Sequence, residues 1–243
     1  MKRIGILAIG ALFFSHAAMA ATWSIISISV EPQNAVAVAE AADALMKSEL
    51  GKEFTGRLLL QVNVADGDNP ATHSFVPVYN TAAEREAFSA KLQDDPAWAT
   101  FQKTMTAKSK PVSNVMYRTV QRWGEISDDD VVWRLHSFNV RDPAAFAAAL
   151  DTFLKSKTGK TFPGQVFLSS VVAGGISPVS HVISVGQVSE AAIEEWETSL
   201  RGNADWAAYL ETSQNAAEYL GNNIVRTVKT WGAPLEKVTA PSM

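Results

Sequence analysis

Hydrophobic and polar residues alternate along several short stretches of the chain, which is typical of half-buried β-strands. The stretches are residues 23–30, 58–64, a segment that starts at His73, and 115–123. After the first stretch, Val38, Ala42 and Leu45 fall on one face of a helix, and Gly51 is expected to end it. Two more helical segments precede the last stretch. The pattern predicts the order strand, helix, strand, strand, helix, helix, strand.

The same order recurs in the second half of the chain. Residues 43–124 align with residues 151–232 at an offset of 108 without a gap, and about 25 of the 82 aligned positions are identical. Trp98, for example, meets Trp206. The first strand of the second half, residues 132–140, aligns at an offset of 110 instead. Self-similarity over this length indicates one structural unit used twice.

A unit of this order and length is typical of a ferredoxin-like βαββαβ fold, in which helices cover one face of an antiparallel sheet. The other face is apolar and must be hidden, and two such sheets can hide each other. We therefore predict an α+β protein with two tandem ferredoxin-like repeats, residues 21–125 and 126–235, whose antiparallel sheets pack into an α+β barrel. The acidic segment Glu125–Asp130 links the repeats, and residues 236–243 form a C-terminal tail.

Residues 1–20 have the features of a secretory signal peptide. Two basic residues precede the apolar run 4–14, which is too short to cross a bilayer comfortably. Ala18 and Ala20 provide small residues for cleavage before Ala21. A membrane anchor is the alternative, but no longer apolar stretch supports it. We expect a periplasmic or secreted protein without a membrane partner after cleavage.

Charge and cysteine content limit the classes of partner and of chemistry that the chain can have. The chain carries 21 basic and 25 acidic residues and no basic run. Because clustered lysine and arginine are needed to neutralise phosphates, a nucleic-acid partner and an anionic membrane surface are disfavoured. The chain has no cysteine. Disulfides, thiolate nucleophiles and cysteine-bound metals are therefore excluded.

Three histidines lie outside the predicted signal peptide. His73 and His181 are equivalent positions at the start of the third strand of each repeat, whereas His136 stands where the first repeat has Ile26. Such an imidazole could act as a general base or ligand contact, or could hold the preceding turn by a hydrogen bond. Because the first and third strands are neighbours in this fold, His136 and His181 are expected to lie close together. No third ligand accompanies them, so we predict no metal site.

Aromatic and cationic residues that recur in both repeats are candidate ligand contacts. Trp98 and Trp206 are each followed by an aromatic residue three positions later, which suits packing of a short helix or a pocket wall. Arg118 and Arg226 recur within the last strand. Each could form a buried ion pair or bind an anionic ligand.

The order of elements and the segment Asp95–Phe101 after the second long helix resemble the dimeric α+β barrel superfamily, here as a tandem repeat in one chain. That superfamily includes antibiotic-biosynthesis-monooxygenase-like domains and stress-responsive A/B barrel domains. Its members include cofactor-free oxygenases, isomerases, haem-degrading enzymes and proteins without assigned activity. The resemblance implies a fold and leaves the function open.

The resemblance also implies site residues. An asparagine that faces the pocket in oxygenases and haem-degrading members would correspond to Asn139, and a pocket tryptophan to Trp98, Trp206 or Trp133. Asn139 could equally satisfy the following turn. Haem-degrading members also use a histidine on the second helix, whereas this chain has none at residues 82–93 and 190–201.

Three functions remain open. The first is binding of a small apolar or aromatic ligand without catalysis. The second is a cofactor-free oxygenase or isomerase in which His136, Asn139 and His181 position and deprotonate a small aromatic substrate. The third is a haem-binding protein with His73 or His181 as axial ligand; otherwise no cofactor is expected. We expect a monomeric pseudo-dimer, although edge strands or outer helix faces could still pair two chains.

Overall fold

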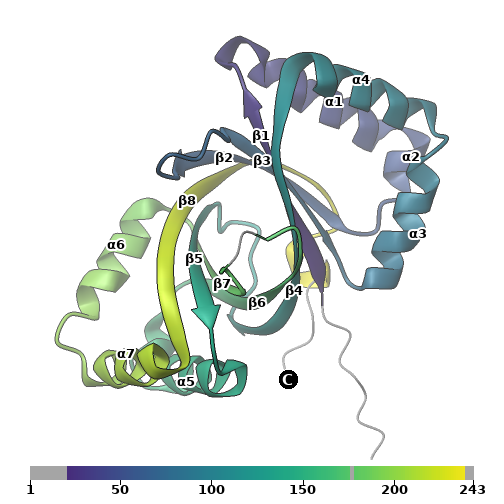
Figure 1. Cartoon of the computed structure of the whole chain (residues 1–243). Helices are drawn as coiled ribbons and strands as arrows, with labels where there is room; N and C mark the ends of the chain where they lie inside the picture. The colour runs from purple at the N-terminus through teal and green to yellow at the C-terminus, as the bar shows by residue number, and fades with distance from the viewer. Residues whose placement is uncertain (1–20, 176–177, 239–243) are drawn as a thin grey trace, which may run out of the picture.

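The computed structural model describes residues 21–175 and 178–238, so the predicted signal peptide and residues 239–243 of the predicted tail lie outside the described residues. The chain forms an eight-stranded closed barrel with helices on its outer surface (Figure 1). No helix in this described part is long and apolar enough to cross a membrane. The α+β class agrees with the prediction.

Each repeat has the predicted order of strands and helices. The first contains β1 (Thr22–Val30), α1 (Ala35–Lys47), α2 (Glu49–Lys52), β2 (Arg57–Ala65), β3 (His73–Tyr79), α3 (Ala82–Leu92), α4 (Pro96–Lys108) and β4 (Ser109–Gly124). The second contains β5 (Val132–Val140), α5 (Pro143–Lys155), β6 (Gln165–Ala173), β7 (His181–Gln187), α6 (Glu190–Ser199), α7 (Ala204–Ala216) and β8 (Ala217–Gly232). Short 3-10 turns occur at Pro32–Asn34 and Gly159–Thr161, and the first residues of the predicted tail belong to helix α8 (Leu235–Val238).

Side-chain caps fix where most of the long helices begin. Thr81 starts α3 and Asp95 starts α4, each by accepting a hydrogen bond from a backbone N–H of the first turn. Asp142, Ser189 and Asn203 do the same for α5, α6 and α7. Such a cap typically contributes about 1 kcal/mol because it satisfies a donor that the helix itself cannot.

The strands pair antiparallel in the closed order β1-β3-β2-β8-β5-β7-β6-β4. Each repeat supplies four adjacent strands. The repeats meet at two seams, where β2 pairs with β8 and β4 pairs with β6. The two sheets therefore enclose one interior, and the predicted barrel of two ferredoxin-like repeats is confirmed.

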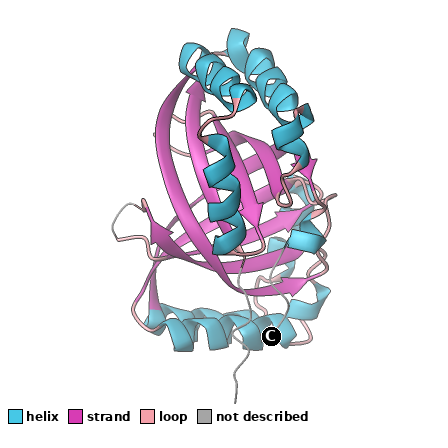
Figure 2. Ribbon diagram, turned by 90° about the vertical axis from the view of Figure 1, so that its right-hand side faces the viewer, coloured by secondary structure: helices cyan, strands magenta, loops and turns pink. Residues whose placement is uncertain are grey.

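The helices lie in two layers on opposite sides of the barrel (Figure 2). Helix α1 packs on α4 in one layer, and α5 packs on α7 in the other. Buried apolar residues accordingly form three clusters, one under each helix layer and one inside the barrel. These three places are where space for a ligand can arise.

The long last strands tie each helix layer to the other repeat. Strand β8 runs on to α1, where the Lys229 ammonium and Trp231 Nε1 both donate hydrogen bonds to Asp43, the latter at 2.8 Å. At the equivalent place, Trp123 Nε1 of β4 donates to Asp151 of α5 at 2.9 Å. These tryptophans therefore join the two repeats as well as closing their own strands.

One glycine expectation is wrong. Helix α1 ends at Lys47, and Gly51 lies inside the next helix, α2, rather than ending α1. A Cβ at Gly51 would lie 2.2 Å from the carbonyl oxygen of Leu45, and a Cβ at the equivalent Gly159 would lie 2.1 Å from that of Phe153. Glycine recurs here because the backbone approaches the preceding helix too closely for any side chain.

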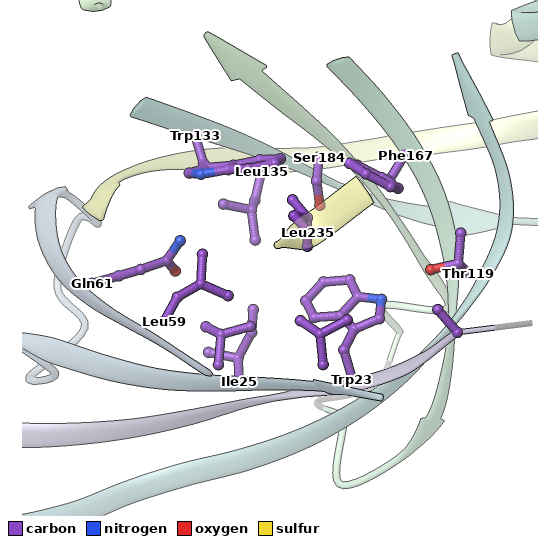
Figure 3. Close-up of a pocket in the computed structure, with 13 residues that line it drawn as sticks. Trp23, Ile25, Leu59, Gln61, Thr119, Trp133, Leu135, Phe167, Ser184 and Leu235 are labelled. Carbon is purple, nitrogen blue, oxygen red and sulfur yellow. The ribbon is translucent and has the colours of Figure 1, made fainter. Parts of the chain in front are cut away.

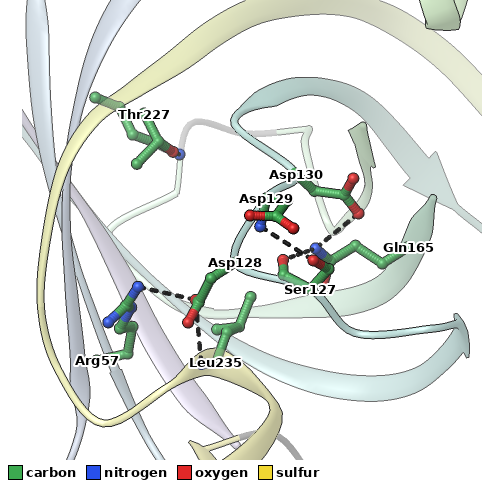
Figure 4. Close-up of polar contacts among 9 residues, drawn as sticks. Arg57, Ser127, Asp128, Asp129, Asp130, Gln165, Thr227 and Leu235 are labelled. Carbon is green, nitrogen blue, oxygen red and sulfur yellow. Dashed lines mark hydrogen bonds and ion pairs between the residues drawn. The ribbon is translucent and has the colours of Figure 1, made fainter. Parts of the chain in front are cut away.

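The linker between the repeats is held by equivalent residues of β2 and β6 (Figure 4). Arg57 forms an ion pair with Asp128 at 2.9 Å, and the same carboxylate accepts the backbone N–H of Leu235 at 3.3 Å. Gln165 Nε2 donates to Asp130 at 2.9 Å. Burial raises the pKa of Asp130 to about 6, partly offset by this hydrogen bond. The linker thus joins both sheets to the C-terminal helix.

Candidate functional site

A cavity of about 480 Å³ lies under the helix layer of the second repeat. Strands β5, β6, β7 and β8 form its floor, and helices α5, α6 and α7 cover it. Twenty residues line it, and sixteen of them are apolar or aromatic. Its volume and lining fall in the range usual for small-molecule sites. The aromatic wall consists of Phe138, Phe153, Phe162, Trp196, Trp206, Tyr209 and Tyr219.

His136 is the only histidine in this lining. It lies in the middle of β5, opposite Ile183 of β7 and Asn222 of β8, and its face of the strand is turned toward the helices. Burial, followed by the charge of Arg134, lowers its pKa to about 4. His136 is therefore neutral at physiological pH and offers one N–H donor and one nitrogen acceptor.

Neither ring nitrogen of His136 has a hydrogen-bond partner among the described residues. Its nearest aromatic neighbour is Tyr219, with ring centroids 6.0 Å apart. An unsatisfied polar group in an apolar site is costly unless a ligand or water pairs with it. The imidazole is thus the natural polar contact for a molecule in the cavity.

An ion pair borders the cavity beside His136. Arg134, two residues earlier on the same face of β5, pairs with Glu197 of α6. Glu197 lines the cavity, whereas Arg134 does not. The pair joins α6 to the sheet and leaves a carboxylate, rather than a cation, at the cavity wall.

Two further polar groups lie in the aromatic wall. Trp196 Nε1 is buried without a hydrogen-bond partner in the described chain. Burial raises the pKa of Tyr209 to about 12, partly offset by a hydrogen bond with Ser213, so the phenol stays protonated. Together with His136, these groups give the cavity neutral hydrogen-bonding atoms and no free charge.

The prediction that His136 and His181 lie close together holds for their strands but does not bring both side chains into the cavity. β5 and β7 are neighbours, but His181 lies opposite Phe138 and is not part of the cavity lining. A hydrogen bond of 3.0 Å joins His181 Nδ1 to the hydroxyl of Ser180. His73 of the first repeat makes the same contact with its preceding residue, Thr72, at 2.9 Å.

These hydroxyls have a structural role at the end of the first strand. Ser180 accepts a hydrogen bond from the backbone N–H of Val140, and Thr72 accepts one from that of Val30. Burial lowers the pKa of both neighbouring histidines. The equivalent geometry in the two repeats fits the turn-holding alternative for His73 and His181.

Among the other predicted contacts, only Trp206 belongs to the cavity. Trp206 lines the cavity, whereas Trp98 stacks on Phe101 in the first repeat at 5.2 Å. Asn139 follows Phe138 on β5, so alternation turns it to the face opposite His136, where it donates to Glu218 at 3.5 Å.

The two arginines of the last strands do not reach the cavity. Arg226 forms a 2.7 Å ion pair with Glu190, and the two side chains are 43% and 46% exposed. Arg118 is exposed on β4. Trp133, the third candidate tryptophan, lies inside the barrel rather than under the helices.

Sequence reasoning missed several cavity residues because each looks ordinary by itself. The signal that could have found them is the difference between equivalent positions of the two repeats. The pairs, first repeat then second, are Phe88 and Trp196, Ser89 and Glu197, Phe101 and Tyr209, and Met105 and Ser213.

The residues of the cavity do not fit haem. Its lining contains no lysine or arginine to pair with the two haem carboxylates, and Glu197 would oppose them. The predicted axial ligands, His73 and His181, are absent from the lining. Within the described part of the chain, no group of three or more histidine, aspartate or glutamate residues could hold a metal ion.

No protein-family model matches the sequence, and no curated protein matches it. Solved structures do match its fold. A proposed monooxygenase of Lactobacillus acidophilus NCFM superposes with a TM-score of 0.64 at 12% identity, covering 92% of this chain and 99% of its own. An anthrone oxidase-like protein gives a TM-score of 0.56 at 11% identity, covering 89% and 94%.

A haem-binding protein of Thermus thermophilus gives a TM-score of 0.52 at 10% identity, covering 87% of this chain and 92% of its own. Identities this low establish a shared fold and no shared chemistry. The chain therefore has the architecture of the dimeric α+β barrel proteins, with its candidate site under the helices of the second repeat.

Proposed function

We propose that the second repeat binds a small, neutral aromatic ligand in the cavity under its helices. The proposal rests on a neutral, unpaired imidazole, His136, in a mostly apolar cavity of about 480 Å³. Aromatic walls favour flat apolar molecules through burial and ring contacts. A hydroxyl group on the ligand would form a hydrogen bond with His136 without burying an unpaired charge.

The charge of the wall sets the ligand class. Glu197 is the only charged group in the lining, and Arg134 already pairs with it. A carboxylate or phosphate on the ligand would meet no cation, and its desolvation would be uncompensated. We therefore expect neutral phenols or hydroxylated polycyclic molecules to bind, and their carboxylated analogues to be rejected.

We also propose that the protein is exported and that one chain forms the whole barrel. Residues 1–20 are expected to be removed as a signal peptide, giving a periplasmic or secreted protein that starts at Ala21. The duplicated unit would supply within one chain the two sheets that a homodimer would otherwise provide. Intact-mass measurement of protein from an exported fraction tests both points, since it reports the cleavage site and the number of chains.

Titration with matched naphthalenes tests the ligand proposal. We expect 1-naphthol to bind, naphthalene to bind roughly 10-fold more weakly because it leaves His136 unpaired, and 1-naphthoate not to bind. Intrinsic tryptophan fluorescence reports binding because Trp196 and Trp206 line the cavity. Ser213→Met, which places the residue of the first repeat in the cavity, is the blocking control. Equal binding of 1-naphthol to Ser213→Met and the wild type would refute this site.

The unpaired His136 nitrogen also supports a second candidate, cofactor-free oxygenation of a phenol-like substrate. A neutral imidazole can accept the proton of an acidic hydroxyl or carbon acid. Its pKa of about 4 makes it a weak base, which is why binding without catalysis comes first. Oxygen uptake with anthrone as probe separates the two: turnover lost in His136→Gln would support catalysis, and no uptake above buffer would remove it.

A further inference from the structure

The barrel interior contains two adjoining cavities that are separate from the site described above. One, of about 70 Å³, lies near the end of the barrel where Leu235 of α8 packs (Figure 3). The other, of about 210 Å³, lies toward the opposite end, where the exposed Asn69 forms part of the wall. Ile25, Gln61 and Leu135 line both, so the two spaces meet at these side chains.

The smaller cavity holds hydrogen-bonding groups that nothing satisfies. Ser184 Oγ and Trp133 Nε1 are both without a partner in the described structure, and their residues are only 6% and 7% exposed. Figure 3 shows the Ser184 hydroxyl directed into the open space between the two sheets. A buried donor without an acceptor is costly, and native proteins normally pair it with protein, water or ligand.

Neighbouring polar groups in the same interior show the contrast. Trp23, the counterpart of Trp133 in the first repeat, donates from Nε1 to Ser169 Oγ at 3.3 Å. Gln61 Nε2 donates to Thr227 at 3.3 Å. The barrel therefore satisfies polar groups on one side of its interior and leaves the donors of Trp133 and Ser184 open.

The walls also define what can enter. No ionisable residue lines the smaller cavity, so a charged group would be stranded there. The larger cavity exceeds the roughly 150 Å³ that suffices for a benzene-sized guest. Its lining is mixed, because valines such as Val115 and Val225 share it with serines, asparagines and one carboxylate, Asp66. The space therefore suits a neutral, single-ring molecule that carries one acceptor.

We propose that the barrel interior is a second ligand site, which takes a small neutral molecule with an aromatic or short aliphatic body and a carbonyl or ether oxygen. The oxygen accepts a hydrogen bond from the Ser184 hydroxyl, and the body lies beside Ile25 and Leu135, which line both cavities. This site is independent of His136 and of the helix layers.

Fluorine NMR with two matched probes tests the proposal. The probes are 4′-fluoroacetophenone, which has a carbonyl acceptor, and 1-ethyl-4-fluorobenzene, which has none. We expect a bound resonance of the ketone that persists in Ser213→Met, where the added methionine narrows the helix-layer cavity. In Ser184→Val, which introduces the equivalent Val76 of the first repeat, the ketone should bind roughly 2- to 10-fold more weakly and the ethyl compound at least as tightly.

Controls keep the outcomes distinct. Circular dichroism verifies the fold of each variant, and Ser184→Ala serves if the valine is not accommodated. Loss of the bound ketone resonance in Ser213→Met would show that only the helix-layer cavity binds and would overturn the proposal. Unchanged ketone affinity in both Ser184 variants would overturn it too. Binding of 1-naphthol, measured separately, should be insensitive to Ser184→Val, so failure of one site does not mimic failure of the other.

Discussion

The two helix layers cover equivalent strands, yet different side chains lie beneath them, and the second layer encloses a cavity of about 480 Å³. In the first repeat, Ile26, Phe101 and Met105 pack against the buried cluster under the helices. In the second repeat, the equivalent positions are His136, Tyr209 and Ser213, and all three line the cavity. Shortening Met to Ser removes most of a side chain, and replacing Ile by His introduces an unpaired imidazole.

This difference shows what duplication permits. One repeat keeps a packed layer that stabilises the barrel, while the other accepts a cavity and an unsatisfied polar group, both of which cost stability. The long last strands offset part of this loss of stability, because Asp43 and Asp151 anchor each helix layer to the last strand of the other repeat. Substitutions that exchange residues between the repeats test the comparison directly.

The largest expected effect comes from truncating the buried residue that anchors the first helix of each repeat to the sheet. Phe146 of α5 and its counterpart Val38 of α1 are both fully buried. Phe146→Ala should lower the free energy of unfolding by about 3–5 kcal/mol, whereas Val38→Ala should lower it by about 2 kcal/mol because only two methyl groups are removed. Urea unfolding followed by circular dichroism measures both. Equal losses would mean that the cavity lined by Phe138, whose ring lies 4.9 Å from that of Phe146, already weakens the contacts of Phe146.

Exchanging the residues at the Met105 and Ser213 positions should move the cavity. Met105→Ser should cost roughly 1–2 kcal/mol of unfolding free energy, because it removes a half-buried side chain that packs against the cluster under α1. Ser213→Met should weaken 1-naphthol binding by narrowing the cavity, while changing stability by less than about 1.5 kcal/mol. Thermal unfolding and fluorescence titration of the two single variants provide the comparison. Unweakened binding by Ser213→Met would place the ligand elsewhere.

His136→Ile installs the residue of the first repeat at the polar contact. Without the imidazole, 1-naphthol should lose roughly 10-fold in affinity, about 1.4 kcal/mol, and naphthalene should bind at least as well as to the wild type. The ratio of the two dissociation constants is the measurement. In the wild type this ratio should stay constant between pH 6 and 8, because His136 is already neutral there. A transition near pH 6.5 would contradict the assigned environment.

The smallest effects are two opposite dependences of the free energy of unfolding on pH. His136 has its pKa lowered to about 4, so the stability that its neutral form provides is lost as pH falls from 6.5 toward 4. Asp130 has its pKa raised to about 6, so protonation favours the folded state as pH falls from 6 toward 3.8. Asp130→Asn should therefore stabilise the protein by roughly 1–2 kcal/mol at pH 7.5 and by little at pH 4.

Difference curves separate these two contributions. The melting temperature of Asp130→Asn minus that of the wild type should fall as pH is lowered, whereas the same difference for His136→Ile should rise. Parallel curves for the two variants would show that neither group titrates as the structure indicates. The counterpart of Gln165 is Arg57, whose cation pairs with Asp128, so the first-repeat side of the linker lacks the carboxyl–amide contact that Asp130 makes.

The fold was predictable from the sequence because its signals are local and repeated. Alternation along residues 23–30 and 132–140 predicts strands, and the offset of 108 shows that one unit occurs twice. The register of β4 and β8, which begin earlier than predicted at Ser109 and Ala217, is a tertiary property: their early residues pair with β1 and β5.

The site was predicted only in part. His136 stood out because the first repeat has no histidine at that position, and Trp206 was a candidate because it recurs. The cavity itself depends on the sizes of side chains such as Ser213 and Leu200, which are distant along the chain from β5. Neighbouring strands placed His181 near His136, but the register puts Phe138 opposite His181. Alternation patterns contain no such information about packing.

The most direct test of the central claim is a crystal structure of the protein soaked with 4-bromo-1-naphthol, measured at the bromine absorption edge. We predict an anomalous peak under α5, α6 and α7, with the ligand hydroxyl within hydrogen-bond distance of His136, and no peak under α1 and α4. Equal peaks under both helix layers, or a peak under the first layer alone, would contradict the claim that the second repeat carries the site.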